Sequence, residues 1–391
     1  MKILVVLSRI PYPLDKGDKL RAFHQIKELS KNNEVYVFCL NGSPVHPKSK
    51  DIILSFEKKI LISSFNFLDS SLGVIASFFD GTPFQVGYFS HKKNIKELKA
   101  FCKEVNPDII YYQFVRTAKY AIEGYPKVLD YQDALSVNMR GRALKSSFLK
   151  RYFFNIEAKR LEKYEAKMFD IFQKLTIIVE ADKKAIKHPL QKEIAVIPNG
   201  VDESYFNYSK PQEKEFDLIF SGAMSYPPNI DAANFLAKQI MPLVWEKLPD
   251  TKLVIAGVNP SLSVQKLKSR NIVVTGWVED MKEYYAKSKI FIAPMQIGTG
   301  LQNKLLEAMA MGLPCISSPL ANDALRATHN ENILIAQSPK EYANQIIDLL
   351  QNKEKANLLA EKGNNFVKEN YCWASYCNKL EEVLKEVALT K

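Results

Sequence analysis

Short apolar runs alternate with helical patterns along most of the chain, and this alternation is the strongest constraint on its fold. Residues 2–8, 34–40 and 216–222 are apolar at successive positions, as expected of strands buried on both faces. Residues 18–31 and 229–247 instead repeat apolar side chains with helical spacing. We therefore expect an α/β protein made of doubly wound parallel sheets with right-handed crossovers.

The chain has 391 residues, which is too long for one ordinary hydrophobic core. Five strands are expected in its first half and six in its second, so we predict two Rossmann-like domains facing each other across a cleft. Residues 189–191 break a helical pattern ahead of a new apolar run, which places the boundary there. The expected domains span residues 1–188 and 189–370, and a C-terminal helix at 371–391 is expected to pack back on the first domain.

The formal net charge of +11 would suit a nucleic acid, an anionic membrane or an acidic substrate as partner. The excess belongs wholly to residues 1–189, which carry a net +12, against −1 for the remainder. Five cysteines without a CxxC pair indicate free thiols in a reducing compartment. We expect no signal peptide at the start and no membrane span in the apolar residues 61–79, which indicates a cytoplasmic protein.

The most informative motif follows the expected strand at residues 290–295. Gly298 and Gly300 allow a close backbone approach to a ligand, and a helix expected to begin near Leu301 would offer free N–H groups to an anion. Lys304 lies in the first turn, where a cation opposes the helix dipole unless an anion is near. Glu307 shares its face and can accept ribose hydroxyls. A plain surface salt bridge between the two is the alternative interpretation.

Several motifs in order carry a family resemblance. They are VIPNGVD at residues 196–202, VVTGWVED at 273–280, IAPM at 292–295 and GTGLQNKLLEAMAMGLP at 298–314. Together they resemble the retaining glycosyltransferases of family four (group 1), which have the GT-B architecture. PLDKGDKLR at 13–21 and FSGAMSYPPNIDAANFL at 220–236 resemble a bacterial subgroup, the PEP-CTERM-associated sugar transferases of exopolysaccharide synthesis.

The resemblance implies transfer of a sugar, with retention, from a nucleotide-diphosphate sugar to a glycan or polyprenyl-linked acceptor. It implies no metal and no cofactor beyond the donor. The donor site would hold these residues: Gly17, Gly222, Trp277, Val278, Gly298, Thr299, Gly300, Leu301, Lys304 and Glu307. Two departures stand out. Thr299 replaces a glutamate that many relatives have near the donor sugar, and Ala223 and Asn229 lie where many relatives carry an arginine and a lysine for the phosphates.

The first domain would bind the acceptor. Lys19 and Arg21 follow the glycine loop, while Gln113 and Arg116 follow an expected strand, and these four are the candidate acceptor contacts. Asp133 also follows a strand and is the third candidate catalytic residue beside Lys304 and Glu307. Two residues separate Asp130 from Asp133, so the pair is not a DxD motif and no metal site is predicted.

Residues 138–169 combine nine cations with aromatic side chains, which suits a helix at an anionic membrane surface on the inner face of the cytoplasmic membrane. A solvated amphipathic helix with its aromatics in the core is the alternative. For the whole chain, the alternatives are another GT-B enzyme such as a nucleotide-sugar epimerase, or a basic nucleic-acid-binding protein. The sequence shows no zinc-finger spacing or RNA-binding motif, and we expect no nucleic-acid partner.

Overall fold

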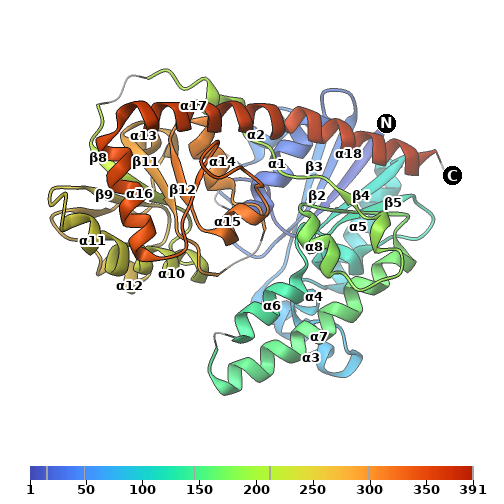
Figure 1. Cartoon of the computed structure of the whole chain (residues 1–391). Helices are drawn as coiled ribbons and strands as arrows, with labels where there is room; N and C mark the ends of the chain where they lie inside the picture. Colours follow the sequence, from blue (N-terminus) through green and yellow to red (C-terminus); the bar gives the residue numbers. More distant parts are fainter. Residues whose placement is uncertain (15, 48, 145, 211–212, 298–299, 390–391) are drawn as a thin grey trace. The chain divides into compact units, whose positions relative to one another are not determined.

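The structure is a computed structural model that describes residues 1–14, 16–47, 49–144, 146–210, 213–297 and 300–389. It divides into two compact units. The first comprises Met1–Pro198 together with Trp373–Lys391, and the second comprises Asn199–Cys372. Each unit is built around one parallel sheet, as Figure 1 shows.

The first unit holds a seven-stranded sheet in the order β3-β2-β1-β4-β5-β6-β7. All of its strand pairs are parallel, and Val5 of β1 lies opposite Val37 of β2 and Tyr111 of β4. The strands are β1 (Lys2–Leu7), β2 (Glu34–Asn41), β3 (Lys59–Ser64), β4 (Ile109–Gln113), β5 (Lys127–Asp130), β6 (Lys174–Ile177) and β7 (Ala195–Val196).

Helices cover both faces of this sheet, so alternate residues of β1 enter two different cores. Ile3 and Val5 pack with α1 (Gly17–Leu29) and α18 (Trp373–Ala388). Leu4 and Val6 pack with α5 (Lys92–Val105) and α7 (Phe148–Ile171). The remaining helices of the unit are α2 (Ser49–Leu54), α3 (Phe67–Asp80), α4 (Phe84–Tyr88), η1 (Val115–Tyr120), α6 (Leu135–Leu144), α8 (Glu180–Ala185) and η2 (Gln191–Glu193).

The second unit holds a six-stranded parallel sheet in the order β10-β9-β8-β11-β12-β13. Its strands are β8 (Phe216–Ser221), β9 (Leu253–Ala256), β10 (Ile272–Val274), β11 (Ser288–Ala293), β12 (Cys315–Ser317) and β13 (Leu334–Ile335). Its helices are α9 (Glu203–Phe206), α10 (Pro227–Phe235), η3 (Leu236–Ile240), α11 (Met241–Trp245), α12 (Leu262–Gln265), α13 (Met281–Ala286), α14 (Asn303–Ala310), α15 (Pro319–Asp323), α16 (Pro339–Gln351) and α17 (Lys353–Asn370).

The expected α/β class with two parallel sheets is confirmed, and some elements differ from the sequence-based expectation. Residues 59–64 form the edge strand β3, which was not among the expected strands. The basic segment 138–169, expected as one helix, is divided between α6 and α7. Residues 189–198 belong to the first unit, beyond the expected boundary, because β7 pairs with β6. Among the described residues, no helix is both long and apolar enough to cross a membrane.

Each sheet has one place where the strand order changes direction. In the first unit this switch point lies between β1 and β4, and in the second it lies between β8 and β11. Successive crossovers leave such a point on opposite faces of the sheet, so the strand ends there open a crevice. The carboxyl ends of these four strands are therefore where each unit offers polar groups to a ligand.

A buried ion pair ties α1 to the sheet of the first unit. Arg21 donates from Nε to Oδ2 of Asp130 at 2.6 Å and from Nη2 to Oδ1 at 3.2 Å. Both side chains have no exposed surface. Thr176 of β6 donates to the same carboxylate at 2.8 Å, and Arg21 also reaches the carbonyl of Pro198 at 3.4 Å. The pair thus connects α1, β5 and β6 with Pro198, the last residue of the unit's first segment.

Replacing Arg21 with an uncharged residue should leave the buried carboxylate of Asp130 without a cationic partner. We expect Arg21→Met to lower the free energy of unfolding by about 3–5 kcal/mol, the usual cost of breaking a buried pair by removing one partner. Urea denaturation followed by circular dichroism measures this loss. The matched control is Lys59→Met, which breaks the exposed pair with Glu104 and should cost less than about 1 kcal/mol. Equal losses in both variants would contradict the assignment.

Candidate active site

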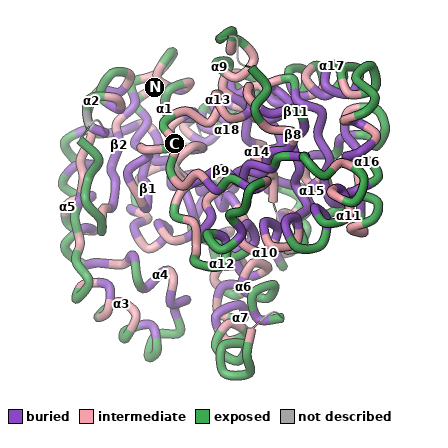
Figure 2. Tube along the Cα trace, turned by 90° about the vertical axis from the view of Figure 1, so that its left-hand side faces the viewer, coloured by how far each residue is buried: buried purple, intermediate pink, exposed green. Residues whose placement is uncertain are grey.

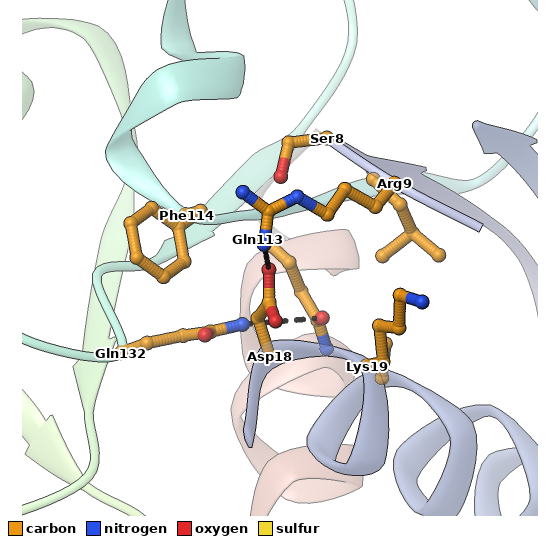
Figure 3. Close-up of a pocket in the computed structure, with 9 residues that line it drawn as sticks. Ser8, Arg9, Asp18, Lys19, Gln113, Phe114 and Gln132 are labelled. Atoms are coloured by element: carbon orange, nitrogen blue, oxygen red, sulfur yellow. Dashed lines mark hydrogen bonds and ion pairs between the residues drawn. The ribbon is translucent and has the colours of Figure 1, made fainter. Parts of the chain in front are cut away.

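A small pocket lies at the switch point of the first unit (Figure 3). Ser8 and Arg9 follow β1, Gln113 and Phe114 end β4 and begin the next loop, and Gln132 follows β5. Asp18 and Lys19 reach the pocket from the first turn of α1. Of the predicted acceptor contacts, Lys19 and Gln113 thus line one pocket, although β1 and β4 are far apart in sequence.

The glycine loop of the first unit carries an ion pair at this pocket. The helix α1 begins at Gly17, and its N-cap residue Lys16 makes no side-chain capping bond. Asp18 instead accepts from Nη1 of Arg9 at 2.8 Å. Arg9 was not among the predicted site residues, although its position directly after the first strand was the available signal. The guanidinium group of Arg9 and the carboxylate of Asp18 therefore lie close to the first turn of α1.

The other two predicted acceptor contacts lie elsewhere. Arg21 is wholly buried in its pair with Asp130, so it supports the sheet and offers no surface to a ligand. Arg116 lies over the rings of Phe114 and Phe89, at 4.5 and 5.4 Å from their centroids, and donates to Gln85 at 2.7 Å. Burial lowers the pKa of Arg116 to about 10. It remains a cation at neutral pH, adjacent to the pocket through Phe114.

Two acidic groups that influence each other lie after β5 and in α8, Asp133 and Asp182. Burial, together with the charges of Asp130 and Asp18, raises the pKa of Asp133 to about 6. Burial and the charges of Asp133 and Glu165 raise the pKa of Asp182 to about 8. Oδ2 of Asp182 has no hydrogen-bond partner in the part of the chain that the structure describes. Asp133 is therefore a carboxyl group that can exchange a proton close to neutral pH, as a general base requires.

In the second unit, two glycines bring the ends of β8 and β9 together. Gly222 and Gly257 have φ angles of +149° and +147°, in the region that L side chains rarely adopt. A Cβ on Gly257 would lie 1.8 Å from the carbonyl oxygen of Gly222, and a Cβ on Gly222 would lie 2.7 Å from Nδ2 of Asn229. The crowding leaves no room for a side chain at either position.

Lys304 is the second residue of α14, which begins at Asn303, two residues later than expected. Its Nζ donates to Oδ1 of Asn229 at 2.5 Å and lies 5.0 Å from the centre of the Phe220 ring. The sulfur of Met295, just beyond β11, is 3.7 Å away. Burial lowers the pKa of Lys304 to about 7, against the opposing charge of Glu307. The ammonium group therefore lies at the switch point, held by neutral groups.

Glu307 lies one helical turn after Lys304, and different side chains contact it. Tyr285 of α13 donates to its Oε2 at 3.0 Å, and the Tyr285 hydroxyl also lies 2.8 Å from Oγ of Ser221. Burial raises the pKa of Glu307 to about 7, while hydrogen bonds from Tyr285 and Tyr205 oppose this shift. No ion pair joins Lys304 to Glu307 in the described part of the chain, so the alternative of a simple surface salt bridge does not describe this pair.

The remaining predicted donor residues are loop residues of the second unit. Gly276 has a φ of +79°, and the following Trp277 is 70 % exposed while Val278 is half-buried. Gly300 has a φ of +87° and Leu301 is half-buried. Gly298 and Thr299 lie outside the described residues. In the sequence, Asn229 stood out only as a departure from relatives. No motif pointed to Tyr285 or Tyr205, because their contacts depend on tertiary packing.

No group of three or more His, Cys, Asp or Glu side chains suited to a metal ion occurs among the described residues. The five cysteines, which include the buried Cys39, Cys102 and Cys315, are free thiols. Lys304 and the N-terminal amides of α14 are groups of the second unit that could meet an anionic ligand.

Comparison with known proteins identifies the family of the second unit. Residues 215–352, most of the second unit, match the model for glycosyl transferases group 1. The second unit carries a group 1 glycosyltransferase domain. A protein of Klebsiella pneumoniae described as a 44.6 kDa protein in the cps region is 23% identical over 387 residues, covering 95% of this chain and 96% of that protein.

Solved structures extend the likeness to the fold of the whole chain. Sucrose-phosphate synthase from Thermosynechococcus elongatus superposes with a TM-score of 0.71 at 12% identity, covering 100% of both chains. Anabaena Alr3699/HepE, solved in complex with UDP and glucose, gives a TM-score of 0.71 at 13% identity, covering 98% of this chain and 99% of that chain. The predicted resemblance to group 1 glycosyltransferases and the predicted GT-B fold are confirmed.

The close approach of the two strand ends can be tested directly. We expect Gly257→Ala to lower the free energy of unfolding by more than about 1 kcal/mol, because its Cβ would collide with the Gly222 carbonyl at a positive φ. Gly141→Ala in α6 is the control. A Cβ there meets nothing within 4 Å, and removing a helical glycine should stabilise by about 0.5–1 kcal/mol. Thermal unfolding of both variants measures the difference, and a stable Gly257→Ala protein would contradict the packing.

Proposed function

We propose that this chain transfers a sugar from a nucleoside-diphosphate sugar to a glycan or lipid-linked acceptor, with retention of configuration and without a metal ion. The observation that carries the proposal is Lys304, a half-buried cation in the first turn of α14 at the switch point of the second sheet. A cation there is unfavourable for the helix dipole by itself and favourable beside a diphosphate. The UDP complex of the HepE neighbour supports the same class of donor.

In the proposed reaction, the bond between the anomeric carbon and the diphosphate oxygen breaks as the acceptor oxygen bonds to the same face of that carbon. Lys304 and the α14 amides stabilise the negative charge that develops on the leaving diphosphate. Glu307, held by Tyr285, accepts the ribose hydroxyls. The acceptor proton passes to a departing phosphate oxygen, and Asp133 contacts the acceptor or sugar hydroxyls.

The proposal assigns acceptor binding to the first unit and donor binding to the second. Lys19 and Gln113 line the first unit's pocket, where an acceptor hydroxyl would be received, and Arg116 lies beside it as a cation for an acceptor phosphate. The Klebsiella relative, described by its place in a cps region, supports a role in cell-surface polysaccharide synthesis. Free, mostly buried thiols suit the reducing cytoplasm, where nucleotide sugars are made.

Lys304→Ala should reduce sugar transfer by about 10²–10³-fold, the usual cost of removing one group that stabilises transition-state charge. A thermal-shift screen of nucleoside-diphosphate sugars first identifies the donor, since a ligand that binds the folded state raises the melting temperature. The control is Lys289→Ala, which removes an exposed lysine of β11 paired with Asp217 and should leave transfer unchanged. Transfer at the wild-type rate by Lys304→Ala would contradict the donor-site assignment.

The pKa of Lys304 predicts a proton linkage. Without a ligand, the side chain of Lys304 has a pKa of about 7, so it is mostly deprotonated at pH 8. A bound diphosphate should raise that pKa. UDP binding at pH 8 should therefore take up as much as about one proton, and affinity should fall as pH rises through 7. Calorimetry in buffers of different ionisation enthalpy measures the uptake. A binding enthalpy that does not depend on the buffer would count against this role, and Lys304→Met should show none of the effect.

Product analysis distinguishes the proposal from a nucleotide-sugar epimerase. Incubated with the donor alone, a transferase should leave the nucleotide sugar's configuration unchanged in the NMR spectrum. Release of an epimeric nucleotide sugar without any acceptor would contradict the proposal.

A further inference from the structure

The helix α3 of the first unit exposes a continuous apolar stripe. Four of its side chains follow one another at spacings of four, three and four residues, which places them on one helix face. They are between 53 and 88 % exposed: Leu68, Leu72, Ile75 and Phe79. Phe67 at the start of the helix is 78 % exposed. Scattered exposed apolar residues are ordinary, but a stripe of this kind marks an interaction surface.

The start of α7 exposes a second apolar group. Phe148, Leu149 and Tyr152 are 83, 80 and 68 % exposed, and Leu144 at the end of α6 is 76 % exposed. This is the segment that carries the basic side chains noted in the sequence. The structure thus turns part of the aromatic content outward, where the alternative interpretation expected it in the core.

Direct contacts join these two helices. Phe84 of α4 packs against Phe78 of α3, with ring centroids 4.7 Å apart, and stacks on Phe153 of α7 at 5.2 Å. Arg160 of α7 donates to the carbonyl of Ser77 in α3 at 2.7 Å. The exposed groups of α3 and α7 therefore belong to one part of the first unit, the lower end in Figure 1, and Figure 2 shows extended exposed segments there.

Cations continue along the same helix. Lys159 and Lys163 lie eleven residues after Phe148 and Tyr152, which places them on the same face of α7, and both are exposed. Neither they nor Lys150 form an ion pair within the described residues. Two acids of α7 are engaged inside the unit: Glu157 accepts from the Phe84 and Gln85 amides, and Glu165 from Ser136. Glu162 is paired with Arg140 and Lys187, and Asp170 near the end of the helix is exposed.

We propose that α3 and residues 148–163 of α7 form a docking surface for an anionic lipid bilayer. Apolar side chains flanked by lysines match the acyl boundary and the headgroup layer of such a surface. A second copy of the chain is the less suitable occupant, because a two-fold contact through this surface would place the lysines of both copies in one interface, where like charges repel. The proposal concerns lipid binding alone and does not depend on the proposed sugar transfer.

Vesicle co-sedimentation of the full chain tests the proposal. We expect binding to vesicles of phosphatidylcholine mixed with phosphatidylglycerol, and weaker binding both to phosphatidylcholine alone and at high salt. Phe148→Ser/Leu149→Ser and Leu68→Ser/Leu72→Ser should each reduce partitioning about tenfold or more. Lys159→Gln/Lys163→Gln should reduce binding to the anionic vesicles only. The control Leu262→Ser removes a leucine that is 75 % exposed in the second unit and should bind as wild type.

Several outcomes would overturn the proposal. They are a wild-type chain that stays in the supernatant with anionic vesicles, and an equal loss of binding in the Leu262 control. Equal binding to neutral and anionic vesicles would overturn the part assigned to the lysines. Light scattering tests the second copy as occupant. If the wild-type chain does not bind vesicles but forms a dimer, and Phe148→Ser/Leu149→Ser dissociates that dimer, the surface is a protein interface and the bilayer proposal is wrong. Because every substituted side chain is exposed, circular dichroism should show an unchanged fold throughout.

Discussion

Both sheets of this chain are buried on both faces, and that constraint decides where chemistry can occur. The central strands carry mostly apolar side chains, as the alternate packing of Ile3 and Leu4 into two cores illustrates. Polar and glycine residues are accordingly concentrated at the carboxyl edge. There each sheet has its switch point, with Arg9 and Gln113 in the first unit and Gly222 and Met295 in the second.

Burial also sets the charge state of the groups at these edges. Lys304 and Glu307 are neighbours on α14, yet each is stabilised by a neutral partner, Asn229 for the lysine and Tyr285 for the glutamate. A second arginine or lysine beside Lys304 could bind the same phosphate, but its positive charge would repel the Lys304 ammonium group. The amide of Asn229 instead holds the ammonium group in place without neutralising it. In the proposed donor site, this arrangement would let one lysine meet the phosphates where many relatives use further cations.

The charge asymmetry of the sequence has a similar origin. Several acids of the first unit are directed inward, where Asp130 binds Arg21 and Glu157 and Glu165 accept backbone amides. Lysines of α7 point outward beside exposed aromatic side chains. The net charge of the first half thus understates how basic its surface is around α7.

The sequence by itself determined the α/β class, all six strands of the second sheet, and the neighbourhood of Lys304 and Glu307, because hydrophobic periodicity and helical spacing are local properties. It missed the edge strand β3, whose burial pattern is weaker than that of the central strands. It also placed Arg21 on a ligand. Only the tertiary structure pairs Arg21 with Asp130 across 109 residues and Lys304 with Asn229 across 75, and only it leaves α3 and α7 exposed. Such partners depend on which strands become neighbours, and strand order is decided by the packing of the whole sheet.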